Sequence, residues 1–275
     1  KSFSNSLLKI WQEIDKNSQQ TVFQLSEWQK NWFEYIGKNQ NYQLNIIVIE
    51  DIEKNKIILP FCIKKIFKIK ILTFLGGNQT DYHAAVFSKK IKIHNNYNIW
   101  TKIEKYLDNF DLIEIPNLIH YQNYEFLLPK EKSFLTLSDK SNYTLLEKSW
   151  ETQKLKLRKK LIQDTLRQRK RLEFLGRLKF QIVNNKNKNY ENLLNIFVDQ
   201  KEDRYKKTGA FNNFYYSEVR NFYKNTLDLM GSNAKIQFST LKLNDQIIAT
   251  HWGAYDQKTF YYLMPSFSSQ FNKFS

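Results

Sequence analysis

The sequence predicts an α+β fold, in which helices and largely antiparallel strands occupy separate stretches of each half of the chain. Segments with a helical period of apolar residues precede and interrupt the strand-like segments, without the regular alternation of a doubly wound fold. The last strand-like segments follow one another through short polar turns, as in an antiparallel meander. An apolar content of 41% over 275 residues is enough to build packed cores.

The first half begins with amphipathic helices and continues with short strands. Ser26 is placed to cap the second helix, and Gly37 is placed to end it. A polar turn at 51–55 between two apolar segments predicts a hairpin. We expect helices at 4–16, 27–36 and 97–107, and strands at 44–49, 56–64, 69–75, 84–87, 112–115, 124–128 and 133–137.

The second half opens with a strongly basic segment, residues 150–180. It carries eleven Lys or Arg against three acidic residues, a balance of +8, which is half of the formal net charge of +16. Apolar residues recur at helical intervals, so we expect one long helix that ends at Gly176. Two interpretations stay open: a solvated surface in a Lys-rich protein, or a cation face for phosphates of coenzyme A, a lipid-linked sugar or tRNA. The apolar residues are Leu155, Ile162, Leu166 and Leu172.

The remaining elements complete the second half, which meets the first near Asp139 to Tyr143. We therefore expect two domains, residues 1–140 and 141–275. The chain has no initiator Met and stops directly after a strand-like run, so we expect a segment of a longer protein whose second lobe is truncated at its end. The expected elements are strands at 178–183, 235–243, 246–255 and 259–264, and helices at 190–207 and 214–230.

Several classes of protein are disfavoured by what the sequence lacks. The single Cys62 excludes an internal disulfide framework and indicates a reducing compartment, so we expect a cytoplasmic protein. No apolar run is long enough for a membrane span. The sequence has no P-loop, Rossmann or nucleophile-elbow motif, and its four histidines show no metal-ligand spacing, so we expect no metal.

Four segments of the second half carry a family resemblance. They are Trp150 with the basic helix and the Leu-Glu-Phe-Leu-Gly at 172–176, the helix end at 200–209 with Arg204, the run at 238–249, and the run at 260–275. The first half adds Ile-Leu-Pro-Phe at 58–61, and Thr-Phe-Leu-Gly-Gly at 73–77 followed by Asp-Tyr-His at 81–83. In order and spacing these segments resemble the FemAB-like acyltransferases, specifically the CelD-type group of cellulose-biosynthesis acetyltransferases.

The resemblance implies two GNAT-like lobes and an acyl-transfer activity. The donor would be acyl-coenzyme A, or an aminoacyl-tRNA ester as in FemX-type transferases. The acceptor would be an amine or hydroxyl of a molecule related to the cell envelope or to polysaccharide synthesis. The chain departs from the family at Phe267-Ser268, where the family has Tyr-Asp. From a different class, a nucleic-acid-binding module that uses the basic helix 154–171 stays open, with tRNA or another polyanion as partner.

His251 is the first catalytic candidate, because acyl transfer needs a group that takes one proton. It lies in a strand where it shares a face with Ala249 and Gly253, small residues that leave room for a ligand. The alternative interpretation is a core histidine. Tyr261 is the second candidate, although Tyr261 and Tyr262 face opposite sides of their strand and only one can line a cleft.

The remaining candidates bind ligands. Arg204 would hold a carboxylate or phosphate of the acceptor, as the family's Arg implies, or would form a surface ion pair with Glu202 or Asp203. Trp252 and the loop residues Asp81 and His83 are further candidates for contact with the acceptor. Lys159, Arg167 and Ser275 are the candidates for coenzyme A, which we expect as a co-substrate.

Overall fold

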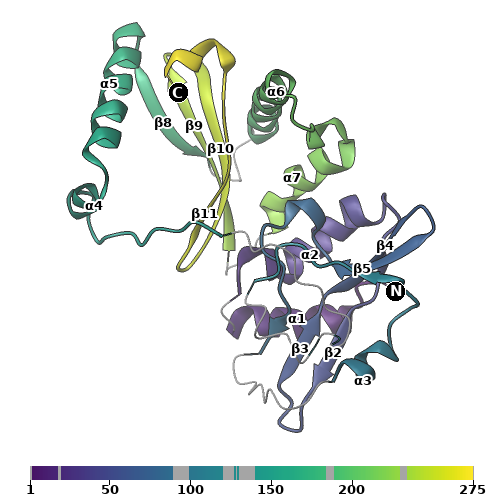
Figure 1. Cartoon of the computed structure of the whole chain (residues 1–275). Helices are drawn as coiled ribbons and strands as arrows, with labels where there is room; N and C mark the ends of the chain where they lie inside the picture. Colours follow the sequence, from purple (N-terminus) through teal and green to yellow (C-terminus); the bar gives the residue numbers. More distant parts are fainter. Residues whose placement is uncertain are drawn as a thin grey trace. The chain divides into compact units, whose positions relative to one another are not determined.

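The computed structural model describes residues 2–17, 20–88, 99–119, 127, 129, 140–183, 189–229 and 234–274. The predicted α+β class is confirmed, with sheets that are mainly antiparallel and are flanked by helices (Figure 1). The chain forms two compact units. Unit 1 consists of Lys1–Leu137, Tyr215–Lys235 and Tyr255–Thr259, and unit 2 consists of Ser138–Phe214, Ile236–Ala254 and Phe260–Ser275.

Unit 1 holds two small sheets, whereas the sequence predicts one. A four-stranded sheet has the order β1-β4-β5-β7, in which β5 and β7 are parallel and the other pairs are antiparallel. A three-stranded sheet has the order β2-β3-β6 and is antiparallel. The strands are β1 (Gln43–Leu44), β2 (Ile47–Glu50), β3 (Lys56–Leu59), β4 (Phe61–Ile66), β5 (Ile69–Phe74), β6 (Val86–Phe87) and β7 (Leu112–Ile113).

Two of the predicted strands are each broken in two, and the pieces belong to different sheets. The predicted strand 44–49 is interrupted after β1, where the amide of Asn45 donates to the Phe61 carbonyl at 2.9 Å and its side-chain oxygen accepts from the Asp108 amide at 2.8 Å. The predicted strand 56–64 is interrupted at Pro60, which has no N–H for a ladder bond. The two breaks let one β-ribbon supply strands to both sheets.

The helices of unit 1 are α1 (Asn5–Asn17), α2 (Ser26–Trp32), which continues as the π-helical turn η2 (Phe33–Gly37), α3 (Trp100–Glu104) and α7 (Ser217–Leu229). Ser26 is the first residue of α2 and not its N-cap. Both its amide and its hydroxyl donate to the Asp15 carboxylate, at 3.0 and 2.6 Å. The helix expected at 97–107 is described only as the shorter α3. The strands expected at 124–128 and 133–137 lie outside the described residues.

Helix α7 packs with unit 1, although the sequence assigns it to the second half. The Asn31 side chain on α2 donates to the Phe222 carbonyl and to the Thr226 hydroxyl, at 3.2 and 2.7 Å. The rings of Trp28 and Phe222 meet edge to face at 5.2 Å. These groups are buried, so they fix α7 to α2 by packing as well as by hydrogen bonds. The domain boundary expected at residue 140 stays a prediction.

Unit 2 is built on one four-stranded sheet with the order β11-β10-β9-β8. Strands β8 and β9 are antiparallel, from the pair Leu178–Leu243 to the pair Val183–Phe238. The turn at Asn244 joins β9 to β10, and its side chain accepts from the Arg177 amide at 2.8 Å, which ties the hairpin to the start of β8. The strands are β8 (Leu178–Val183), β9 (Ala234–Leu243), β10 (Gln246–Asp256) and β11 (Phe260–Phe267), in close agreement with the sequence prediction.

The basic segment forms two helices, α4 (Trp150–Lys156) and α5 (Lys159–Leu175), and not the single helix that we expected. Leu157 and Arg158 between them are extended, with ψ angles of 149° and 128°. Neither residue is Gly or Pro, so no local signal in the sequence marks the break. The expected apolar stripe is also only partly buried. Leu172 packs on Leu243 and Ile248, whereas the side chain of Leu166 is half exposed.

Helix α6 (Tyr190–Thr208) has a buried surface that is rich in apolar residues. The Phe197 ring lies against the rings of Phe214 and Phe238, both in edge-to-face contacts. The Gln200 side chain accepts from the Thr250 hydroxyl of β10 at 2.7 Å. The buried residues of this surface are Tyr190, Leu193, Leu194, Phe197, Val198, Gln200 and Lys201. Among the helices that the structure describes, none combines the length and the apolar character that a membrane crossing requires.

Candidate functional site

His251 lies on β10 among aromatic rings of the neighbouring strand β11. The Tyr262 ring is stacked on the imidazole, with ring centroids 4.4 Å apart and an angle of 15° between the planes. The Phe260 ring is tilted by 45° to the imidazole, with ring centroids 5.6 Å apart. Tyr262 is 68% exposed and Phe260 is 41% exposed, whereas His251 is half-buried. The histidine therefore lies beside two aromatic rings that are themselves open to water.

Gly253 makes the room that this imidazole occupies. A Cβ built at Gly253 would lie 2.6 Å from the His251 Cε1 and 2.8 Å from the Tyr261 carbonyl oxygen. Contacts that short do not occur between real atoms, so any other residue would displace the histidine ring or separate the strands. The sequence already predicts space for a side chain or ligand at this point, since the small residues Ala249 and Gly253 flank His251 on its face of the strand.

The imidazole is neutral and has an unused nitrogen. His251 Nε2 is buried and has no hydrogen-bond partner among the described residues. Burial lowers the pKa of His251 to about 4, and the positive charge of Lys201 lowers it as well. At neutral pH the ring is therefore uncharged and can present a lone pair at Nε2 to an incoming N–H or O–H group.

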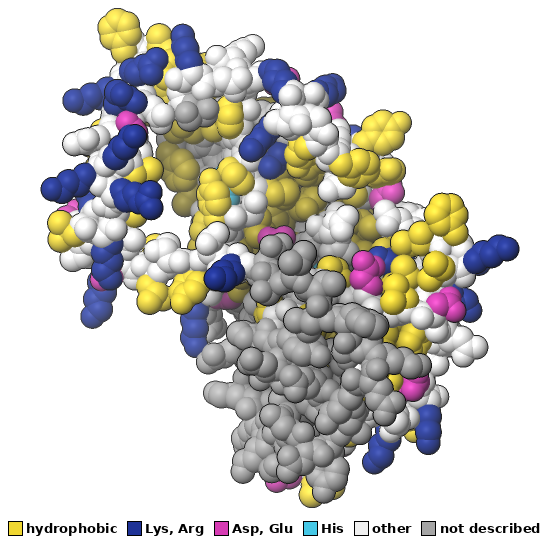
Figure 2. Space-filling view, viewed as in Figure 1, with side chains coloured by type: hydrophobic (Ala, Val, Ile, Leu, Met, Phe, Trp, Pro, Cys, Tyr) yellow, Lys and Arg dark blue, Asp and Glu magenta, His cyan; other side chains and the backbone are white. Residues whose placement is uncertain are grey.

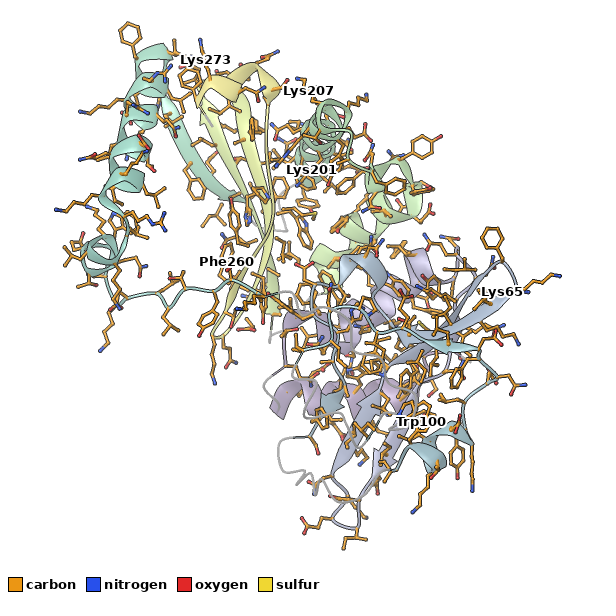
Figure 3. The ribbon with its side chains drawn as sticks, in the orientation of Figure 1. Lys65, Trp100, Lys201, Lys207, Phe260 and Lys273 are labelled. Atoms are coloured by element: carbon orange, nitrogen blue, oxygen red, sulfur yellow. The ribbon has the colours of Figure 1, made fainter. Side chains whose placement is uncertain are left out.

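Lys201 lies on α6 (Figure 3), and its positive charge acts on the His251 imidazole. Its side chain is 7% exposed, and its Nζ lies about 6 Å above the rings of Phe197 and Tyr205, at 6.0 and 5.9 Å. Among the described residues, no carboxylate lies within ion-pair distance of this Nζ. Burial lowers the pKa of Lys201 to about 8, and the charge of Arg204 lowers it too. Among the described residues of unit 2, Lys201 is therefore a largely buried lysine without a carboxylate partner.

Arg204 stands one turn further along α6 and is exposed. The ion pair with Asp203 that the sequence suggested is not present. Asp203 bonds instead to Lys207, at 3.1 Å, and hydrogen bonds from Ser269 and Lys207 lower the pKa of Asp203. The guanidinium of Arg204 therefore stays available next to Lys201. Its binding role stays a prediction.

Tyr261 and Trp252 point away from this histidine. Tyr261 is 9% exposed and alternates along β11 with Tyr262, which is the tyrosine that contacts His251. Trp252 is fully buried next to His251 in the chain, and complete burial argues against contact with a ligand. The catalytic role predicted for Tyr261 and the binding role predicted for Trp252 are both untested.

The residues expected to bind coenzyme A lie on α5 or at the chain end. Figure 2 shows Lys and Arg side chains projecting from α4 and α5. Lys159 begins α5, and Arg167 is exposed and forms an ion pair with Asp164 at 3.1 Å. Ser275 lies outside the described residues. A depression of about 510 Å³ lies beside the break between the two helices. The residues that line this depression are Lys156, Leu157, Arg158, Lys160, Leu161 and Asp164.

Asp81 and His83 belong to unit 1, in a loop held by α2. The indole N–H groups of Trp28 and Trp32 donate to Thr80 and Gln79, at 3.1 and 3.0 Å. Asp81 is exposed, whereas His83 is 2% exposed, and burial lowers the pKa of His83 to about 4. The main chain of His83 pairs with Asn117 and Ile119 at 3.0 Å each. The acceptor-binding role predicted for both residues stays a prediction.

Sequence reasoning missed Lys201 and did not single out Tyr262, which is the tyrosine that stacks on His251. The signal for Lys201 was visible, because it continues the apolar stripe of Tyr190, Leu193 and Phe197 at helical spacing. A lysine on the buried face of a helix is rare enough to mark a candidate site. No comparable signal distinguishes Tyr262 from Tyr261, since alternation only says that they face opposite sides.

A metal centre is not indicated in the described part of the chain, where no group of three His, Cys, Asp or Glu side chains is placed to hold an ion. Residues 159–275 match the family model of the acetyltransferase (GNAT) domain. This segment runs from α5 to the end of the chain, so it includes Lys201 of α6 and the aromatic residues of β11 that contact His251. A comparison with curated proteins gave no match.

Proposed function

We propose that this chain, whose residues 159–275 match the family model of a GNAT-type acetyltransferase domain, is an acyltransferase that uses acyl-coenzyme A. The acceptor is an amine or hydroxyl of a molecule related to the cell envelope or to polysaccharide synthesis, as in the FemAB-like, CelD-type group that the sequence motifs resemble. A cytoplasmic location is part of the proposal, on the argument of the single Cys62. The observation that carries the proposal is the unpartnered Nε2 of a neutral His251 inside this domain.

The reaction needs a base that takes one proton from the attacking amine or hydroxyl of the acyl acceptor. The lone pair of the amine or hydroxyl attacks the thioester carbonyl carbon, the new C–N or C–O bond forms, and the C–S bond breaks. His251 Nε2 takes the proton that the nucleophile loses, and the coenzyme A thiolate leaves. Tyr262 and Phe260 hold the imidazole in place for this transfer and exclude water from its faces.

Because of its low pKa, His251 is unprotonated at neutral pH, but it is a weak base in the free protein. A base works best when its pKa lies near the working pH, so an imidazole with a pKa of about 4 removes a proton only as the nucleophile becomes acidic during attack. Proton transfer is therefore expected to accompany formation of the new bond and not to precede it.

Calorimetry and a thiol-release assay test the choice of donor. Acetyl-coenzyme A and longer acyl-coenzyme A thioesters are titrated into the protein, and release of free coenzyme A is followed with a panel of amine and hydroxyl acceptors. Binding of a thioester together with acceptor-dependent thiol release supports the proposal. If no thioester binds, the coenzyme A donor is wrong, and an aminoacyl-tRNA ester becomes the donor to test.

A polyanion such as tRNA is the second candidate ligand. The depression at the α4–α5 break is lined by Lys156, Arg158 and Lys160, and the helices around it carry most of the excess charge of the basic segment. Such a surface favours phosphates without reading a base sequence. The two candidates are separable, because the polyanion would depend on α5 and proton transfer would depend on β10.

A further inference from the structure

We propose that Lys201 is the binding group for an oxyanion, a carboxylate or a phosphate, carried by the acceptor beside its reacting amine or hydroxyl. The assignment of the oxyanion to the acceptor rests on the proposed acyl transfer, whereas oxyanion binding at Lys201 does not. The substrate class that follows is an anionic acceptor, such as an amino acid or a sugar phosphate, in preference to a neutral one.

The first argument is that Lys201 is a buried cation without a counter-charge. A lysine is almost never 93% buried unless an acidic group pairs with it, because removal of an ammonium ion from water is costly. Here the surroundings are two aromatic rings, about 6 Å away, and a second cation, Arg204. The aromatic faces offset only part of the lost hydration. A ligand oxyanion would supply the missing partner.

The second argument is that the sequence of α6 puts Lys201 on the buried face of the helix. Lys201 occupies a position on the buried stripe where Phe197 precedes it by four residues and Tyr205 follows it by four. An apolar residue at this position would pack in the same place without any desolvation cost. The exposed faces of α6 meanwhile carry Lys206 and Lys207, so the helix has no need of a buried lysine for solubility.

The third argument is the electrostatic effect of Lys201 on His251. The positive charge of Lys201 opposes protonation of the imidazole. An oxyanion bound to Lys201 offsets that charge, so the imidazole becomes a better proton acceptor when the acceptor is bound. Recognition of the acceptor and preparation of the base would then result from one contact. Arg204, exposed one turn away, is placed to contact the same oxyanion from the solvent side.

The test measures binding without acyl-coenzyme A, by NMR of the His251 imidazole. Two matched pairs serve as ligands: β-alanine against β-alaninamide for a carboxylate, and glucosamine 6-phosphate against glucosamine for a phosphate. The anionic member of at least one pair is expected to bind tenfold or more tightly than its neutral partner. The pair that shows the preference identifies the kind of oxyanion. Equal binding within both pairs would overturn the inference.

Variants on α6 separate Lys201 from the general positive charge. Lys201→Met, which keeps the length of the side chain, is expected to remove the preference, and Lys201→Arg is expected to keep it. Lys206→Met is the matched control, because it removes an exposed charge from the same helix. Loss of the preference in the Lys206 variant to the same extent would show that surface charge and not Lys201 attracts the anion.

Two further readouts keep the inference testable on its own. If Lys201→Met does not fold, NMR of the Lys201 side chain in the wild type replaces it: its titration midpoint, near 8 in the free protein, must rise when the anionic ligand is added. Anion binding without any acyl transfer would contradict the proposed function and leave the anion site intact. Acyl transfer with no preference for anionic acceptors would contradict only the anion site.

Discussion

His251 and His83 are both uncharged at neutral pH, and burial is the main cause in each case. Their situations differ in what surrounds the ring. His83 is almost completely enclosed in unit 1, and its main chain is paired with Asn117 and Ile119. His251 is only half-buried and lies between two partly exposed rings. The same shift in pKa therefore accompanies an almost fully enclosed ring in the first case and a half-buried ring beside exposed aromatic side chains in the second.

His251→Gln is expected to lower turnover by roughly a hundredfold or more, with an unchanged melting temperature, because glutamine keeps the approximate size but cannot accept the proton as imidazole does. The measurement is turnover per folded molecule in the thiol-release assay. Tyr262→Phe is the matched control, since it keeps the stacked ring and is expected to have a small effect. A His251→Gln protein with normal turnover would contradict the role of His251 as the proton acceptor.

The stability of unit 1 is expected to fall as the pH is lowered from about 6.5 to about 4. The pKa of His83 is near 6.5 in the unfolded chain and about 4 in the folded one, so the unfolded state binds the proton first and is favoured in this window. His83→Phe removes the effect, and its free energy of unfolding should depend less on pH, by up to about 3 kcal/mol across the window. Urea unfolding at a series of pH values measures this difference; parallel curves for both proteins would contradict it.

At the scale of elements, α5 combines a high charge with sparse packing. Leu172 is its one fully buried side chain among the described residues, and an ion pair of Arg169 with Glu173 at 2.8 Å neutralises only part of its charge. Arg171 lies over the Phe274 ring at 5.1 Å, which attaches the C-terminal part of the helix to η7 (Ser269–Phe274). The N-terminal part of α5 is left to present its cations to solvent.

Charge reversal on α5 decides between the two interpretations of the basic segment. The triple change Lys159→Glu, Arg167→Glu and Lys170→Glu lowers the formal net charge from +16 to +10, since each reversal removes two charges. If α5 binds a polyanion, RNA affinity at low salt should fall by about a hundredfold, together with its salt dependence. If α5 binds the donor, KM for acyl-coenzyme A should rise instead, while kcat changes little.

The matched control for this triple variant carries the same change of charge on unit 1. Lys9, Lys65 and Lys102 are exposed there, and their reversal to Glu also gives +10. RNA binding that weakens equally in both proteins would assign the effect to net charge and not to α5. If neither protein differs from the wild type in RNA binding or in KM, α5 is a solvated surface.

The elements themselves could be predicted where one physical signal dominates. The meander β9–β11 and helix α6 follow from alternation, helical period and polar turns, and their predicted bounds agree with the structure. The break at Leu157 could not be predicted, because no residue there resists a helix. The split of strand 44–49 depends on Asn45 and Asp108, which are far apart in the sequence, so a local pattern cannot reveal it. The same limit applies to the electrostatic effect of Lys201 on His251.

At the scale of the whole molecule, the chain passes between its two units several times. Unit 1 contains α7, which is separated from the rest of that unit by α4, α5, β8 and α6. This return could not be predicted from the sequence, since α7 has an ordinary amphipathic pattern that fits packing in either half. A division of the polypeptide near residue 140 therefore leaves the first core without one of its helices.

A fragment of residues 1–140 is expected to be less stable than unit 1 in the whole chain, by at least about 3 kcal/mol, because it loses the packing of Phe222 on Trp28 and leaves the Asn31 amide without its buried partners. The comparison protein joins residues 1–140 to residues 215–235 through a flexible linker and is expected to recover most of the loss. Urea unfolding followed by tryptophan fluorescence measures both. Equal stability of the two fragments would show that α7 is dispensable for unit 1.

The return of α7 to unit 1 also affects the order in which the two units can fold during translation. A ribosome adds about 5–20 residues per second, so the roughly hundred residues between the first part of unit 1 and the end of α7 take on the order of 5–20 s to emerge. During that interval the face of α2 that carries Trp28 is exposed, while the segments of unit 2 are already leaving the exit tunnel. Neither core can be completed in the order in which it is translated, and the first core keeps apolar surface exposed until α7 has been synthesised.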